Sequence, residues 1–442
     1  MNLLGGGTLP AAAESQYERW LFIRLSGLFD AARINFQGLD GKIDAAERAL
    51  AILNRLSFAQ IVEEGTPFFW MNVHRLLATD SSGPAGPSGS LQYLICHAFD
   101  SYFARLADGQ GVSFEVEEPA VILLPKLGLR VEAEPGLVHL QKLHSNGVRV
   151  EVNGRRSEIE LAAIQGKFRF PLLTVAGRDS TKLLLVSHPS LFEQAYIEAV
   201  TPATQKAKEQ SAMIGDALDL ICAAYPSLGQ RISTSVKWYV PIATDSLDTH
   251  RSFSAASLIG LIFLSEAANE LRLAEAIVHE FHHNELFAYS NVAPLIDGPT
   301  DRLFYSPWRE DARPLYGLIH AVFVFAGVCD FYRRLEQSPA FQRYHEHLWS
   351  LHSERVCQLE IGLAQIPEDQ LTDAGRGLIA SLRSRVEEQR QDLAGYREMP
   401  PSIERHLRIW METHPHLASE VRFSSSAQRM SCATTAINVP IS

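Results

Sequence analysis

The sequence predicts an α+β protein that is mainly helical, with an antiparallel β insert and an HExxH metal site on a buried helix. Apolar residues alternate with polar ones between about residues 112 and 187, whereas apolar residues recur at helical spacing on both sides of that stretch. The HExxH sequence lies in an apolar helical segment. The predicted regions are an N-terminal helical region (1–110), a β-rich insert (111–200), a catalytic HExxH helical domain (201–420) and a C-terminal tail (421–442).

Composition excludes several classes of protein. The chain has 442 residues, enough for two or three domains, and 46% of them are hydrophobic. Its formal net charge of −11 argues against a protein that binds nucleic acid through a basic face. The five cysteines form no CxxC pair, and we find neither a signal peptide nor an apolar run of membrane-spanning length. We therefore expect a cytoplasmic protein with reduced thiols and with no membrane or nucleic-acid partner.

The N-terminal region is expected to be helical from about residue 14 to 78. A loop rich in glycine, proline and serine follows at 80–89, and a further helix is expected at 91–106.

Period-two alternation predicts short strands in the β insert. They are expected at 114–116, 121–124, 129–131, 148–152, 159–161, 168–170 and 183–186. Asn153-Gly154 separates two of these runs and is typical of a type I′ hairpin turn, which favours antiparallel pairing. The insert is either a scaffold or a docking surface on which an extended peptide adds a strand to an exposed edge.

The catalytic domain combines two buried strands with long helices. Its expected elements are a helix at 202–224 ended by Pro226, strands at 236–242 and 259–265, the HExxH helix at 267–289, a loop at 291–306, an apolar helix with Pro314 in its first turn, and helices from 338 to 410 broken at Pro400-Pro401.

The central motif is His279-Glu280-x-x-His283. Positions i and i+4 lie on one face of a helix, so the two imidazoles can bind one metal ion with Glu280 beside it. The longer zinc-peptidase pattern would need glycine at 286 and histidine at 289, and this chain has Leu286 and Tyr289. The longer zinc-peptidase pattern is therefore excluded, and the third metal ligand must come from another part of the chain.

His320 is our expected third ligand. It lies in the apolar helix, where no charged residue stands between Arg313 and Asp330, and a buried polar group needs a partner. Glu310 and Asp311 remain the alternatives, since either would complete a two-histidine, one-carboxylate site.

Arg309 and Arg313 precede the same helix. They either form ordinary salt bridges with nearby carboxylates or bind a ligand carboxylate close to the metal, because a guanidinium grips a carboxylate through two parallel hydrogen bonds. A peptidase has little need of such a clamp, whereas an oxygenase that uses 2-oxoglutarate requires one. The residues alone leave a zinc hydrolase and an iron oxygenase both open.

The two segments together resemble a known family, the HEXXH-motif putative peptide-modification proteins of ribosomal peptide natural-product clusters. The resemblance covers roughly residues 238–332. Its motifs are Val278-His279-Glu280-Phe281-x-His283 and Tyr305-Ser306-Pro307-Trp308-Arg309-x-Asp311-x-Arg313-Pro314-Leu315-x-Gly317-Leu318-x-His320. His282 stands where the family is expected to have glutamine. No radical SAM segment is present, so the chain resembles a stand-alone member.

The resemblance implies an Fe(II)- and 2-oxoglutarate-dependent dioxygenase that hydroxylates a side-chain β-carbon of a precursor peptide. It implies that His279, His283 and His320 hold the iron, and that Arg313, with Arg309 in reserve, binds the 2-oxoglutarate carboxylate. Glu280 would orient water, ligand or substrate, and O2 would be the oxidant.

Two other functions are kept as alternatives. A zinc metallopeptidase acting on a precursor or leader peptide would use Glu280 to activate a zinc-bound water. A non-catalytic peptide-binding module would hold a structural metal. In addition, the small-residue tail containing Asn438 could enter an active site as a hydroxylation target, although a frayed terminus is the simpler interpretation.

Overall fold

The computed structural model describes most of the chain beyond residue 102. The described residues are 96, 99–100, 103–116, 119–124, 127–164, 172–185, 204–244, 247, 250–256, 258–298, 301–393 and 399–423. They form a mixed protein of helices and largely antiparallel sheets, which confirms that part of the predicted fold class. The predictions for 14–78, 80–89, 168–170 and the tail from residue 424 fall outside the described residues.

The chain divides into two compact units. The first, here called the helical unit, contains Asp216–Ser235 and the residues from Asn269 onwards. The second, here called the sheet unit, contains the described residues before Asp216 together with Val236–Ala268. Helix α6 (Thr204–Ala224) crosses from one unit to the other. The domain boundaries expected from the sequence stay a prediction.

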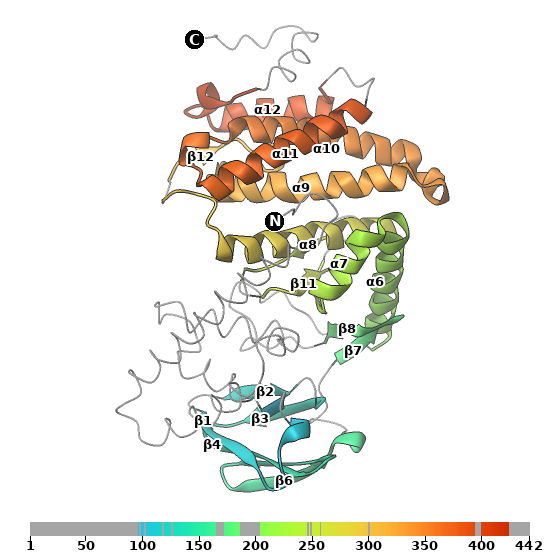
Figure 1. The fold of residues 1–442 in the computed structure, drawn as a ribbon, viewed down its shortest axis with the longest axis vertical. Helices are drawn as coiled ribbons and strands as arrows, with labels where there is room; N and C mark the ends of the chain where they lie inside the picture. The colour runs from blue at the N-terminus through green and yellow to red at the C-terminus, as the bar shows by residue number, and fades with distance from the viewer. Residues whose placement is uncertain are drawn as a thin grey trace. The chain divides into compact units, whose positions relative to one another are not determined.

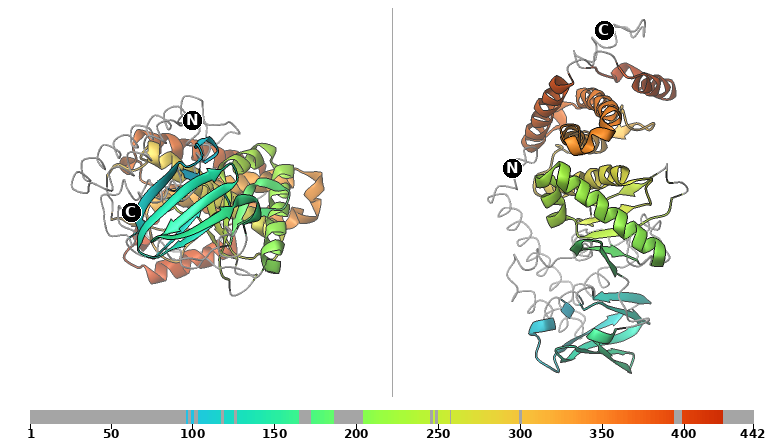
Figure 2. Two further views of the ribbon diagram at one scale, coloured as in Figure 1. Left: turned by 90° about the horizontal axis from the view of Figure 1, so that it is seen from below. Right: turned by 90° about the vertical axis from the view of Figure 1, so that its right-hand side faces the viewer.

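A four-stranded antiparallel sheet lies in the sheet unit. Its strands lie side by side (Figure 2), and their order is β1 (Gly111–Val116), β4 (Gly136–His144), β5 (Gly147–Val152) and β6 (Arg155–Glu160). Buried apolar side chains alternate with polar ones along the strands, and they pack against the hairpin of β2 (Ala120–Leu124) and β3 (Leu129–Ala133). Period-two alternation therefore gives one buried and one open face, as expected.

The predicted hairpin turn is confirmed. Asn153 has φ of 49° and Gly154 has φ of 80°, the two positive angles that a type I′ turn requires. The turn sets the register in which Val152 faces Arg155.

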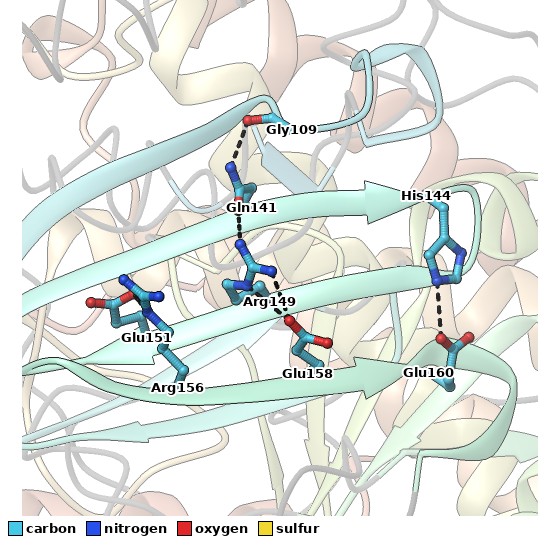
Figure 3. A network of polar contacts seen from close by, with 8 residues as sticks. All are labelled: Gly109, Gln141, His144, Arg149, Glu151, Arg156, Glu158 and Glu160. Atoms are coloured by element: carbon cyan, nitrogen blue, oxygen red, sulfur yellow. Dashed lines mark hydrogen bonds and ion pairs between the residues drawn. The ribbon is translucent and has the colours of Figure 1, made fainter.

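The open face of this sheet carries a polar network (Figure 3). Arg149 donates to Gln141 Oε1 at 2.7 Å and to Glu158 Oε1 at 2.7 Å, and Gln141 donates to the Gly109 carbonyl at 2.7 Å. His144 contacts Glu160 at the end of the sheet, at 3.0 Å. Because these pairs lie at the solvent-facing surface of the sheet, each adds little stability. They are ordinary surface contacts of a solvated sheet.

A second sheet has five strands in the order β10-β11-β9-β8-β7. The bounds are β7 (Leu172–Val175), β8 (Arg178–Leu184), β9 (Trp238–Pro241), β10 (Ser252–Phe253) and β11 (Leu261–Leu264). Strand β9 runs parallel to both of its neighbours, and every residue of β9 and β11 is buried. The continuous apolar runs predicted at 236–242 and 259–265 are these two strands.

The helical unit contains the long helices (Figure 1). They are α7 (Pro226–Ser235), α8 (Glu270–Val292), α9 (Leu315–Glu336), α10 (His345–Gln365), α11 (Asp373–Asp392) and α12 (Pro401–Thr413), with the two-residue strands β12 (Leu303–Phe304) and β13 (Arg313–Pro314) before α9. Short 3₁₀ turns lie at Phe103–Arg105, Leu161–Ala163, Pro339–Tyr344, Glu368–Gln370 and Ala418–Glu420.

Of two prolines named from the sequence, one lies as predicted and one does not. Pro226 follows the end of α6, as expected, and it also begins α7, where its missing N–H is tolerated. Pro314 is the extended N-cap residue of α9 rather than a member of its first turn.

Helix α9 is the centre of the helical unit. Its buried residues join those of α10 and α11 in one hydrophobic cluster. The helix is long and apolar enough to cross a membrane by length and composition alone, contrary to the expectation that no segment approaches that length. Since 72% of its most apolar window is buried within the structure, the core position accounts for this composition.

Candidate metal centre

Helix α8 presents the HExxH motif. The helix begins after Asn269, whose side-chain Oδ1 accepts a hydrogen bond from the Arg272 backbone N–H at 3.0 Å, a standard N-cap. Ile277, Val278 and Phe281 are fully buried and fix the apolar face. The motif residues therefore lie on a regular helix, where His279 and His283 share one face.

Helices α8 and α9 run antiparallel past each other at the motif. His279 contacts Phe325, with ring centroids 5.0 Å apart, and one turn later His283 contacts His320 at 5.4 Å. Phe287 then contacts His320 at 4.8 Å. The order of contacts along α9 is reversed relative to α8, so the predicted third ligand faces the motif.

The three histidines are neighbours, and two of them are hydrogen-bonded. His283 Nδ1 lies 3.2 Å from His320 Nδ1, and the rings of His279 and His283 are 4.9 Å apart. One Nδ1–H must donate this hydrogen bond and the other Nδ1 must accept it, so the accepting imidazole is neutral. His320 is buried, and its Nε2 has no hydrogen-bond partner among the described residues.

Burial keeps these imidazoles neutral. Desolvation, with a smaller effect of the neighbouring His282, lowers the pKa of His283 to about 4. Desolvation followed by the effect of His283 lowers the pKa of His320 to about 3. Desolvation also lowers the pKa of His279 well below its ordinary value. A neutral imidazole is the form that binds a metal, so the donor chemistry fits Fe(II) or Zn²⁺.

The side chains do not yet point to one common position. Among the described residues, no three histidine, cysteine, aspartate or glutamate side chains form a group that could hold a metal ion as they stand. The His283–His320 hydrogen bond occupies both Nδ1 atoms, whereas the buried His320 Nε2 is available as a ligand. Rotation of imidazole side chains within the α8–α9 pair is therefore the change that metal binding requires.

The other two polar residues of the motif have different surroundings. Glu280 is 2% exposed, and its backbone carbonyl accepts a hydrogen bond from the Asn284 side chain at 3.0 Å. His282 faces α9 and contacts Glu285 through Nδ1 at 2.9 Å. A Cβ atom at Gly327 would lie 2.1 Å from its ring. His282 therefore packs between the helices and is not directed at the other histidines.

Glu285 extends the His282 contact to Arg231 of α7, which forms an ion pair with it. Burial alone would raise the pKa of Glu285, but the hydrogen bond and charge of His282 and the charge of Arg231 together lower it. The network ties α7 to α8 behind the motif.

The arginines expected to bind 2-oxoglutarate contact a carboxylate of the chain itself. Arg309 Nε donates to Asp311 Oδ1 at 3.0 Å, and Arg313 donates to Asp311 Oδ2 at 2.9 Å. Asp311 and Glu310 are exposed, and no described contact joins either of them to the three histidines. The geometry therefore favours His320 over these carboxylates as the third ligand.

Other residues around the motif were not predicted from the sequence. Tyr316 and Phe287 pack around His320 as tilted rings, with centroids 4.3 and 4.8 Å from the centroid of its ring. Phe325, next to His279, stacks on Trp308 at 4.9 Å and carries the Arg355 guanidinium 5.0 Å from its centroid. Arg355 lies 35 positions beyond His320, and only the packing of α10 on α9 brings it to the motif.

Comparison with known proteins finds no family model that matches this chain and no curated protein similar to it in sequence.

Proposed function

We propose that this chain is an Fe(II)- and 2-oxoglutarate-dependent oxygenase that hydroxylates a side-chain β-carbon of a ribosomally made precursor peptide. The observation that carries the proposal is the contact of His283 with His320 across α8 and α9, with His279 one turn away. Together with the HExxH and Tyr305–His320 motifs, it supports a three-histidine metal centre between α8 and α9.

Each residue of the proposed centre has a defined task. His279, His283 and His320 hold the metal through neutral nitrogens, and bound iron supplies the redox chemistry that activates oxygen. Phe287 and Phe325 pack against the imidazoles and limit access of water. Glu280 orients water, ligand or substrate beside the metal. Exclusion of water matters because it protects reactive species from side reactions.

The reaction balances without a further reductant. 2-Oxoglutarate is oxidised to succinate and CO2, and one atom of O2 enters succinate. The second oxygen atom enters a C–H bond of the peptide as a hydroxyl group. Because a side-chain carbon is the target, the chain must bind an exposed, extended part of its substrate. An edge of the four-stranded sheet remains a proposed docking surface for it.

The experiment is anaerobic reconstitution with Fe(II), followed by addition of oxygen, 2-oxoglutarate and a ribosomally made precursor peptide. We expect succinate and a peptide heavier by one oxygen atom. His320→Ala should abolish both products and lower the bound metal. A matched control, His347→Ala on α10, removes a histidine remote from the motif in sequence and should leave both unchanged.

The main competing outcome is hydrolysis. A zinc metallopeptidase would cleave the same peptide when loaded with Zn²⁺, and Glu280→Gln would abolish cleavage without loss of metal. Absence of succinate together with such cleavage contradicts the oxygenase. A hydroxylated product that is unchanged by Glu280→Ala leaves the oxygenase but removes the assigned task of Glu280.

A further inference from the structure

An arginine that the motifs do not contain lies beside the proposed metal centre. Arg355 belongs to α10, and its guanidinium carbon lies 5.0 Å from the centroid of the Phe325 ring. The same ring lies 5.0 Å from the His279 ring. The guanidinium is therefore no more than about 10 Å from the first histidine of the motif, with one aromatic ring between them, a cation–π arrangement.

Arg355 has an unused donor. Its Nη1 donates to Gln358 Oε1 at 2.7 Å, but its Nε is buried and has no hydrogen-bond partner among the described residues. Within the same part of the chain, no carboxylate forms an ion pair with Arg355. A guanidinium is charged at any physiological pH, and a buried N–H of it without an acceptor is costly.

A second buried donor lies next to the same ring. The Trp308 indole stacks on Phe325 with an interplanar angle of 9°, and its Nε1 also has no hydrogen-bond partner among the described residues. Each of these N–H groups is buried without an acceptor beside the Phe325 ring, and a buried donor of this kind calls for a partner.

The protein holds this platform in place. Gln358 Nε2 donates to the Pro307 carbonyl at 3.1 Å and so links the Trp308 segment to the helix that carries Arg355. A Cβ atom at Gly362 would lie 2.9 Å from the indole, so glycine is what lets Trp308 pack this closely on α10. By contrast, Arg309 and Arg313 are exposed or half-exposed and share the carboxylate of Asp311.

We propose that Arg355, assisted by Trp308, binds the far carboxylate of the 2-oxo diacid co-substrate, in place of Arg313 and Arg309. This inference rests on the proposed function and specifies its co-substrate site. The far carboxylate of 2-oxoglutarate lies three carbon–carbon bonds beyond its 2-oxo group, roughly 4 Å in an extended chain. That reach suits a cation one aromatic ring away from the histidines.

The test is calorimetric titration of the full-length, Fe(II)-loaded protein without oxygen. Two probes are used: 2-oxoglutarate, and 2-oxobutyrate, which lacks the far carboxylate. Arg355→Gln should weaken 2-oxoglutarate binding by roughly 10- to 100-fold, the range for loss of a charge-assisted bidentate contact, and leave 2-oxobutyrate binding unchanged. Arg355→Lys should recover part of the loss, and Trp308→Phe should weaken binding by a smaller factor.

Two further variants complete the design. Arg383→Gln removes an exposed α11 arginine that pairs with Glu368, and it should leave both affinities unchanged. If Arg313→Gln removes the preference for 2-oxoglutarate over 2-oxobutyrate and Arg355→Gln does not, the role of Arg355 is overturned. The proposed oxygenase function then still stands. If the wild-type protein binds neither 2-oxo acid, the proposed function and the inference both fail. Unchanged 2-oxobutyrate affinity also shows that Arg355→Gln is folded.

Discussion

At the residue scale, burial decides the behaviour of the histidines in this protein. His279, His283 and His320 sit among aromatic rings with lowered pKa values, and His282 is used in packing between helices. The sequence placed all four on predicted helices, but it could not show that His282 packs between the helices while the other three histidines lie together. That difference depends on which side of α8 faces α9, and it became visible only through contacts such as His282 with Gly327.

His406 of α12 provides a pH prediction away from the motif. Desolvation lowers the pKa of His406, and its Nδ1 lies 3.1 Å from the Tyr305 hydroxyl. The unfolded state therefore binds more protons than the folded state as pH falls through about 6.5, so the contribution of His406 is present above that pH and is lost below it. Denaturant unfolding should show that the free energy of unfolding falls more between pH 7.5 and pH 5 in the wild type than in His406→Gln. Equal losses in both proteins would contradict this account.

At the element scale, close approach of α8 and α9 builds the candidate site. Gly327 allows the His282 ring to lie against the α9 backbone, and the antiparallel crossing then brings His320 to His283. Periodicity predicted both helices and the apolar character of α9. Periodicity could not predict how the two helices cross, because their close approach depends on the absence of a side chain at Gly327.

Gly327→Ala tests the role of this contact. The added methyl would meet the His282 ring, so we expect the free energy of unfolding to fall by about 1–3 kcal/mol, as for overpacking of a core. Gly377→Ala is the matched control, because that position is exposed on α11 with no atom within 4 Å of the added Cβ. It should raise stability by about 0.5–1 kcal/mol through helix propensity. Similar effects from both substitutions in denaturant unfolding would show that the contact is not restrictive.

At the scale of the whole molecule, alternation and helical periodicity predicted most elements but not their assembly. The strands at 114–116, 121–124, 129–131 and 148–152 were identified from their patterns, and the Asn153-Gly154 turn from its residue types. The longest strand of that sheet, β4, was missed although its buried residues also alternate. The five-stranded sheet joins segments far apart in the chain, and pairing of that kind leaves no local signal.

The same limit applies to the site. The HExxH histidines could be proposed as metal ligands from their spacing. His320 could be proposed as the third ligand because a lone histidine is conspicuous in a helix without charged residues. The sequence could not single out Arg355, because one arginine on a helix is ordinary until its neighbours are known, and its role stays a proposal. Localisation in the cytoplasm, the precursor peptide as partner and any role of the C-terminal tail stay predictions.

The central claim is that one metal ion is bound by three histidines. Crystals of the Fe(II)-reconstituted protein, measured on both sides of the iron and zinc absorption edges, test it most directly. We expect one anomalous peak at the iron edge within bonding distance of His279, His283 and His320, with the His283–His320 hydrogen bond broken. A metal ion coordinated by Glu310 or Asp311 in place of His320, or no metal ion at the motif, would contradict the account.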